Sequence, residues 1–268
     1  MLNHIQKITN LPVSSIKNTL ALLAEDCTIP FIARYRKERT GNLDEVQIEQ
    51  IVTLKEAFET LEKRKATILK AMEEQGELTT ELSVKISEAK DITTLEDIYL
   101  PFKKKRKTKA ETARKNGLEP LAKIIMAQKA HDVNGLALRY ITKAVTSVEE
   151  VLEGARYIIA EWVNERVDIR NNIRQELARR AMISTKVVKA KNDDEKAQKF
   201  RDYFAWEESL SRCPSHRLLA ILRAEKEGFI RVKIEIDNER TLQKMEYKLI
   251  RSQGKCAAQI EKAIADAY

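Results

Sequence analysis

The sequence predicts a mainly α-helical protein: an elongated assembly of helices that includes two long ones, with at most one short β unit near 229–236. Two observations favour helices. The chain has only 7 glycines and 5 prolines in 268 residues, whereas sheet-rich folds need many tight turns built from such residues. Apolar residues also recur at spacings of three and four over long stretches, which is typical of amphipathic helices.

The N-terminal part should begin with two short helices. The first is expected over 13–25, with Ser14 or Ser15 as its N-cap, because its leucines and isoleucines share one face. The second should start near Pro30, where a missing N–H costs little, and end at Gly41.

A long third helix is predicted over 44–75. Asp44 opens it, and no glycine or proline interrupts the apolar pattern before Gly76. At 1.5 Å per residue this helix would be roughly 48 Å long, and we expect it to pack along other helices as a rib. Shorter helices should follow over 79–90, 94–99 and 109–115, with another beginning near Pro120.

A second long helix, or a pair of helices, is predicted from 148 to 183, where apolar residues again follow the helical period. The polar stretch 189–196 is the expected boundary between domains 1–192 and 193–268. Beyond it, 229–236 alternates apolar and charged residues, which is typical of a half-buried strand. The remaining helices are expected between Pro214 and Gly228, over 239–252 and over 255–267.

The composition excludes several classes of protein. No segment has the roughly 18 consecutive apolar residues of a membrane span, and the N-terminus lacks the layout of a signal peptide. The cysteines Cys27, Cys213 and Cys256 are odd in number and far apart, so a disulfide framework is not expected. We therefore expect a cytoplasmic protein with no membrane partner.

The net charge of +8 is concentrated in two short stretches. Residues 103–115 hold eight Lys or Arg and one Glu, and residues 166–191 hold eight Lys or Arg and two acids. Localised basic charge favours contact with a polyanion, although two solvated helix faces would give the same composition. The candidate nucleic-acid contacts are Lys103, Lys104, Lys105, Arg106, Lys107, Lys109, Arg114, Arg166, Arg170 and Arg174. The last three are four residues apart, so we expect them to form one stripe on the predicted helix.

The residues offer no recognisable catalytic or metal-binding constellation. Cys213 and His216 have a CxxH spacing, but the sequence places no further ligands at a matching spacing. Ser215 and His216 are adjacent, so their side chains diverge and cannot form a catalytic pair. No glycine-rich phosphate loop is present either. We expect no cofactor, no bound metal and no enzymatic activity.

Three stretches carry a resemblance to a known family: 29–38 (IPFIARYRKE), 95–103 (LEDIYLPFK) with 117–122 (GLEPLA), and 199–204 (KFRDYF) with 214–217 (PSHR). In this order they resemble the N-terminal region of the Tex family of bacterial transcription accessory proteins. The family motif residues are Pro30, Phe31, Arg34, Tyr35, Arg36, Lys37, Glu38 and Gly41. Tyr35 and its cationic neighbours could clamp nucleic acid. We favour a packing role in which Phe31, Ile32 and Tyr35 face a core and the cations pair with Glu38 or nearby acids.

The resemblance implies that this sequence corresponds to about the first third of a family member. RNase H-like, helix-hairpin-helix and S1 domains would follow it, and a helix-turn-helix-like unit would lie within it. The expected function is a non-catalytic scaffold that binds RNA or DNA weakly and without sequence preference, acting with the transcription machinery, most simply as a monomer. The alternative is a structural or protein-docking framework, with nucleic-acid binding confined to the missing modules.

Overall fold

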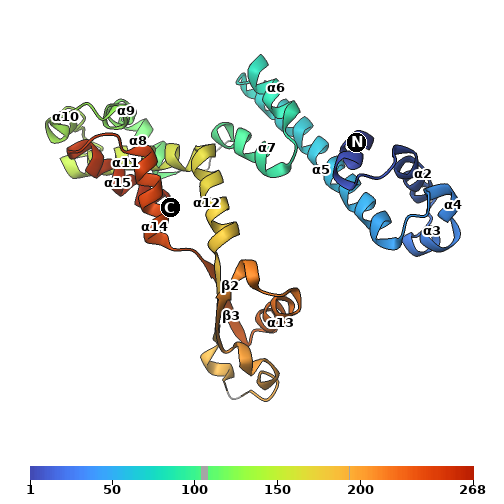
Figure 1. Cartoon of the computed structure of the whole chain (residues 1–268). Helices are drawn as coiled ribbons and strands as arrows, with labels where there is room; N and C mark the ends of the chain where they lie inside the picture. The colour runs from blue at the N-terminus through green and yellow to red at the C-terminus, as the bar shows by residue number, and fades with distance from the viewer. Residues whose placement is uncertain (104–107, 193) are drawn as a thin grey trace. The chain divides into compact units, whose positions relative to one another are not determined.

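The computed structural model describes residues 1–103, 108–192 and 194–268, and the prediction of a mainly α fold is confirmed (Figure 1). The chain divides into two compact units, 1–103 (unit 1) and 104–268 (unit 2). The predicted boundary at 192/193 lies in the chain between two strands that pair in one sheet of unit 2, and the division into domains 1–192 and 193–268 stays a prediction from the sequence. In the described part of the chain, no helix is long and apolar enough to cross a membrane.

Unit 1 is built on the long helix α5 (Glu45–Gln75), which confirms the predicted helix over 44–75. Asp44 accepts a hydrogen bond from the Gln47 amide, and the Gln47 side chain accepts one from the Asp44 amide. This capping box satisfies amides at the helix start that have no partner within the helix. Gly76 ends the helix with a positive φ of 72°.

Short helices cover the two ends of α5. Those at its N-terminal end are α1 (Leu2–Thr9), α2 (Val13–Ala24), α3 (Ile29–Tyr35) and α4 (Lys37–Thr40). Their shared core includes Ile16, Ile32 and Ile48, each fully buried. Those at its C-terminal end are α6 (Thr80–Glu88), α7 (Ile92–Tyr99) and the 3-10 turn η1 (Leu100–Phe102).

The helical core of unit 2 surrounds α11 (Val148–Glu165). The helices packed with it include α8 (Lys109–Lys115), α9 (Glu119–Ala127), α10 (Val133–Leu138), α14 (Asn238–Leu249) and α15 (Lys255–Ala267). Ile158, Ile159 and Ile260 are fully buried in this core. Residues from opposite ends of unit 2 therefore share one core.

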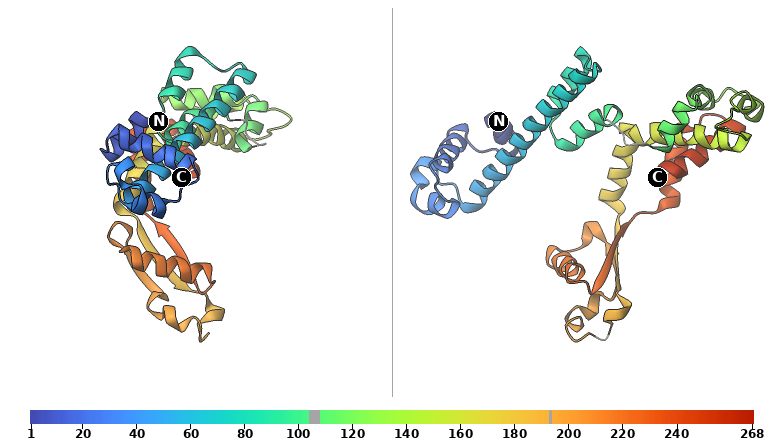
Figure 2. Two further views of the ribbon diagram at one scale, coloured as in Figure 1. Left: turned by 90° about the vertical axis from the view of Figure 1, so that its right-hand side faces the viewer. Right: turned by 180° about the vertical axis from the view of Figure 1, so that it is seen from behind.

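The rest of unit 2 is the helix α12 (Val167–Arg180) and a small β lobe, residues 182–235. The lobe has an antiparallel sheet in the order β2 (Ala205–Ser209), β1 (Met182–Val187), β3 (Ile230–Glu235). Helix α13 (Ser215–Lys226) lies alongside the strands (Figures 1 and 2). The 3-10 turns are η2 (Lys189–Lys191), η3 (Gln198–Tyr203) and η4 (Leu210–Arg212).

Several elements differ from the prediction. The stretch 148–183 contains a pair of helices, one of the two arrangements predicted, because the backbone of Arg166 is extended. Its end differs from the prediction, since Met182 and Ile183 belong to β1. The strand over 229–236 is confirmed as β3, but its partners β1 and β2 were missed, as were α1 and α10. Neither Ser14 nor Ser15 caps α2: Pro12 holds the cap position, and Ser15 is buried inside the helix.

Candidate nucleic-acid interface

The first predicted basic stretch is only partly described. Lys103 is exposed and follows η1 in unit 1. The predicted contacts Lys104, Lys105, Arg106 and Lys107 lie outside the described residues. Their role as phosphate contacts therefore stays a prediction from the sequence.

Lys109 and Arg114, on α8, interact with neighbouring helix side chains. The Lys109 ammonium donates to the Tyr157 hydroxyl at 3.0 Å and lies 4.6 Å from the centre of its ring. That hydrogen bond raises the pKa of Lys109. Arg114 pairs with Glu161 at 2.6 Å, and its side chain is 28% exposed. Both cations join α8 to α11, which makes them poorer phosphate contacts than their place in the sequence suggests.

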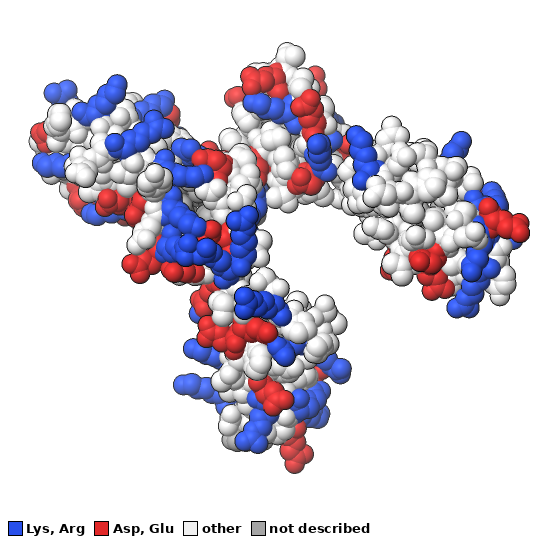
Figure 3. Space-filling model, in the orientation of Figure 1, with Lys and Arg blue, Asp and Glu red and all other residues white. Residues whose placement is uncertain are grey.

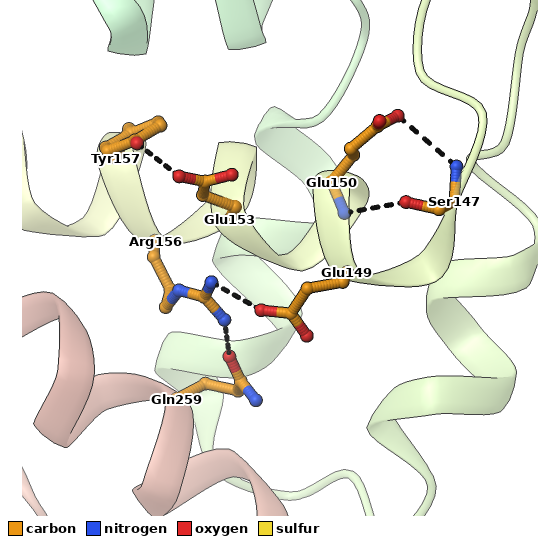
Figure 4. A network of polar contacts seen from close by, with 7 residues as sticks. All are labelled: Ser147, Glu149, Glu150, Glu153, Arg156, Tyr157 and Gln259. Atoms are coloured by element: carbon orange, nitrogen blue, oxygen red, sulfur yellow. Dashed lines mark hydrogen bonds and ion pairs between the residues drawn. The ribbon is translucent and has the colours of Figure 1, made fainter.

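A cleft of about 500 Å³ lies between α8 and α11, beside Lys109 and Tyr157. Its polar lining includes the carboxylates of Glu150 and Glu153, and Glu153 accepts a hydrogen bond from Tyr157 (Figure 4). With two carboxylates and one lysine, the lining of the cleft has a net negative charge. It is therefore a poor site for a polyanion.

The predicted arginine stripe is divided by the start of α12. Arg166 precedes the helix and holds Asp168 through two hydrogen bonds of 2.9 and 2.8 Å. This pairing lowers the pKa of Asp168. Arg170 bonds to the side-chain oxygen of Asn164 at 3.3 Å, and Arg174 to that of Asn171 at 3.0 Å. The prediction that the three arginines form one stripe is wrong, because only Arg170 and Arg174 lie on the helix.

Helices α12 and α14 form a shallow groove of about 300 Å³ whose lining includes two lysines and one glutamate. It is lined by Asn172, Gln175, Glu176, Lys244, Tyr247 and Lys248, and we call it the α12/α14 groove. Tyr247 is 89% exposed. Thr241, Met245 and Leu249 are buried and hold α14 against the core of unit 2. Lys and Arg side chains gather over this part of unit 2, with acids beside them (Figure 3).

Each of the two groove lysines has an acidic neighbour. Lys244 contacts Glu176 at 2.5 Å and lowers the pKa of that carboxyl. Lys248 lies 4.0 Å from Asp168. Both lysine side chains are more than a third exposed, whereas Glu176 is 16% exposed. Each ammonium has three N–H donors, so it can contact a phosphate besides its acidic neighbour. A phosphate can therefore bind at these ammonium groups, while the neighbouring amides can donate hydrogen bonds to it.

Sequence reasoning missed the α14 side of this groove. The spacing of Lys244, Tyr247 and Lys248 in the sequence could have predicted it. They stand at i, i+3 and i+4, so on a helix they share one face. Their stretch was not part of either basic cluster, since residues 238–249 hold three Lys or Arg and two Glu, a net charge of only +1.

The family motif at 30–41 is divided between core and surface. Ile32 and Ala33 are buried, but Phe31 is 37% exposed and Tyr35 is 67% exposed. The prediction that Phe31 and Tyr35 face a core is therefore wrong. They lie one helical turn apart on the solvent side of α3, together with the exposed side chain of Arg34.

No metal site emerges from the part of the chain that the structure describes, where no group of three or more His, Cys, Asp or Glu could hold an ion. Near the predicted CxxH spacing, burial raises the pKa of Cys213. Arg217 in turn binds Glu208 through two hydrogen bonds of 2.9 and 2.7 Å.

Comparisons with known proteins match most of the chain. Residues 1–73 match a family model described as the Tex-like protein N-terminal domain, and residues 128–268 match one described as Tex central region-like. The transcriptional accessory protein Tex of Neisseria gonorrhoeae is 40% identical over 237 residues, which cover 88% of this chain and 31% of that protein.

Two further relatives extend the comparison. The uncharacterized protein YdcI of Bacillus subtilis is 37% identical over 268 residues, covering 98% of this chain and 37% of that protein. The human S1 RNA-binding domain-containing protein 1 is 27% identical over 248 residues, covering 89% of this chain and 24% of that protein. The chain spans 31% to 37% of the length of the two bacterial relatives.

Proposed function

The chain belongs to the Tex family of transcriptional accessory proteins, and from this premise we propose that it is a non-catalytic, nucleic-acid-binding scaffold acting in transcription in the cytoplasm. The observation that carries the proposal is the α12/α14 groove, where two lysines flank an exposed tyrosine. Lysines offer phosphates a point charge with no geometry that reads bases. Binding is therefore expected to be weak and without sequence preference.

Two further observations support this function. The second is the basic stretch at 103–115, whose eight Lys or Arg and one Glu give a net charge of +7. The third is the human relative, whose name includes an RNA-binding domain. None of these distinguishes RNA from DNA, because phosphate contacts are shared by both.

The test is a charge reversal in the groove. Lys244→Glu/Lys248→Glu, the groove variant, should flatten the slope of log K against log salt by about 1.8 for a duplex, at roughly 0.9 per lost phosphate contact. Binding is measured by fluorescence anisotropy with a labelled duplex at several salt concentrations. The matched control is Lys143→Glu/Lys226→Glu, which makes the same charge change at two exposed lysines outside the groove.

The comparison separates the proposed interface from a general charge effect. The control variant should bind more weakly but keep its salt slope near that of the wild type. Equal slopes for the groove variant and the control would contradict the groove as the contact surface. No binding by the wild type at low salt would favour the alternative function, a structural or protein-docking framework. The contacts of Lys109 with Tyr157 and of Arg114 with Glu161 are consistent with that alternative, because they join helices of unit 2.

A further inference from the structure

The solvent side of α3 and α4 in unit 1 carries two aromatic rings among four cations. The rings of Phe31 and Tyr35 lie 5.3 Å apart, tilted by 43°. The guanidinium carbon of Arg36 lies 5.1 Å from the centre of the Phe31 ring, within cation–π range. We call Phe31, Tyr35 and Arg36 the α3 platform.

Buried contacts beneath the platform hold it in place. Ile32 and Ala33, on the opposite side of α3, are buried in the core that α3 shares with α5. The following helix α4 ends at Gly41, whose φ is 72°, and a Cβ there would lie 2.7 Å from the Ser15 hydroxyl. The turn therefore packs closely on α2. Because the backbone is fixed on both sides, the exposed rings are presented with little conformational freedom to lose on binding.

The charges around the platform favour an anionic ligand. Residues 34–39 contain four cations and one carboxylate, and they line a cleft of about 400 Å³. Arg34 and Arg39 have only loose acidic neighbours, Glu45 at 3.8 Å and Glu25 at 3.7 Å, with all four side chains at least half exposed. Among the described residues, no carboxylate lies within ion-pair distance of Arg36 or Lys37. These cations are therefore available to phosphates.

We propose that the α3 platform is a base-stacking site for single-stranded nucleic acid. Every nucleobase has a π face that can stack on an aromatic ring, and the flanking cations can contact the phosphates on either side. Bases in a duplex are already stacked on each other, so the site should select unpaired strands. The proposal deepens the function proposed above, on which it rests, by adding a contact made through bases.

The test compares two ligands of equal charge. One is a labelled oligodeoxythymidine of about 12 nucleotides, within the usual span of ~4–16 for a single-strand site, and the other is an abasic phosphodiester chain of the same length. Tyr35→Ala should weaken binding of the first about 5- to 150-fold, which corresponds to the roughly 1–3 kcal/mol of one stacked base. It should leave binding of the abasic chain unchanged. Tyr35→Phe keeps the ring and should bind like the wild type.

Two controls protect this result. Because Tyr35 is 67% exposed, the variants should retain the wild-type circular dichroism spectrum. A photocrosslink from an oligonucleotide containing 5-iodouracil provides an independent readout and should map to the peptide that contains Phe31 and Tyr35.

Several outcomes would overturn the stacking site. These are equal losses for both ligands, no loss with Tyr35→Ala, or competition by polyglutamate as effective per charge as the oligonucleotide. The groove variant distinguishes the two proposals. If it loses binding while Tyr35→Ala does not, the proposed function stands and the stacking site falls. If Tyr35→Ala loses binding while the groove variant does not, the stacking site stands and the groove is not the contact surface.

Discussion

Arg156 is a buried charge in the middle of α11, and its two partners explain why it is tolerated there. Its side chain is 9% exposed and donates to Glu149 at 2.7 Å and to Gln259 at 2.8 Å (Figure 4). Gln259 lies on α15, so the guanidinium connects two helices that are far apart in the sequence. A buried cation without such partners would be strongly destabilising.

The Arg156–Glu149 pair makes stability depend on pH. The hydrogen bond from Arg156 lowers the pKa of Glu149 below its ordinary value of 4.5. A carboxyl with a lowered folded-state pKa stabilises the fold above its unfolded pKa and loses that contribution as pH falls through the folded pKa. At pH 7 the wild type should be more stable than Glu149→Gln by up to about 1 kcal/mol, since Glu149 is largely exposed.

Urea unfolding followed by tryptophan fluorescence measures this effect in unit 2, because both tryptophans, Trp162 and Trp206, lie there. The difference between wild type and Glu149→Gln should shrink steadily between pH 5 and pH 3. A difference that stays constant over that range would show that the ionised carboxylate does not contribute.

At the scale of elements, the sequence predicted those helices whose ends are encoded locally. Helix α5 begins at a capping box and ends at a glycine with positive φ, and both signals are readable in the sequence. Strand β3 was predicted from its strict alternation. Strands β1 and β2 were missed because their sequences do not alternate clearly between apolar and polar residues. They are defined by pairing, of β1 with β2 on one side and with β3 on the other.

The cap of α5 can be tested directly. Asp44→Ala removes the acceptor for the Gln47 amide and should destabilise unit 1 by about 1 kcal/mol, within the usual 0.5–2 for a lost N-cap. Asp44→Asn keeps a capping oxygen and should be nearly neutral. Hydrogen exchange of the Gln47 amide should accelerate in the first variant only. Equal exchange in both variants would mean that the side chain of Asp44 does not hold the helix start.

At the scale of the whole molecule, the location of charge in the sequence predicted only part of the proposed interface. It identified α12, but it also selected Lys109, Arg114 and Arg166, whose partners are visible only after folding. It passed over α14, because the groove requires two helices separated by some 60 residues of sequence to meet. The exposure of Phe31 and Tyr35 could not be predicted from the helical spacing of apolar residues either. That spacing shows which residues share a face of the helix, but not which face packs against the core.

The central claim is that this region of a Tex-family protein binds nucleic acid through phosphate contacts. The most direct measurement is the salt dependence of the binding constant of the wild-type chain for a duplex. If three to five phosphates are contacted, log K should fall against log salt with a slope of roughly −3 to −4.5, and Kd should be on the order of 10⁻⁴ to 10⁻⁶ M at physiological salt. A slope near zero, or no binding at low salt, would contradict the claim.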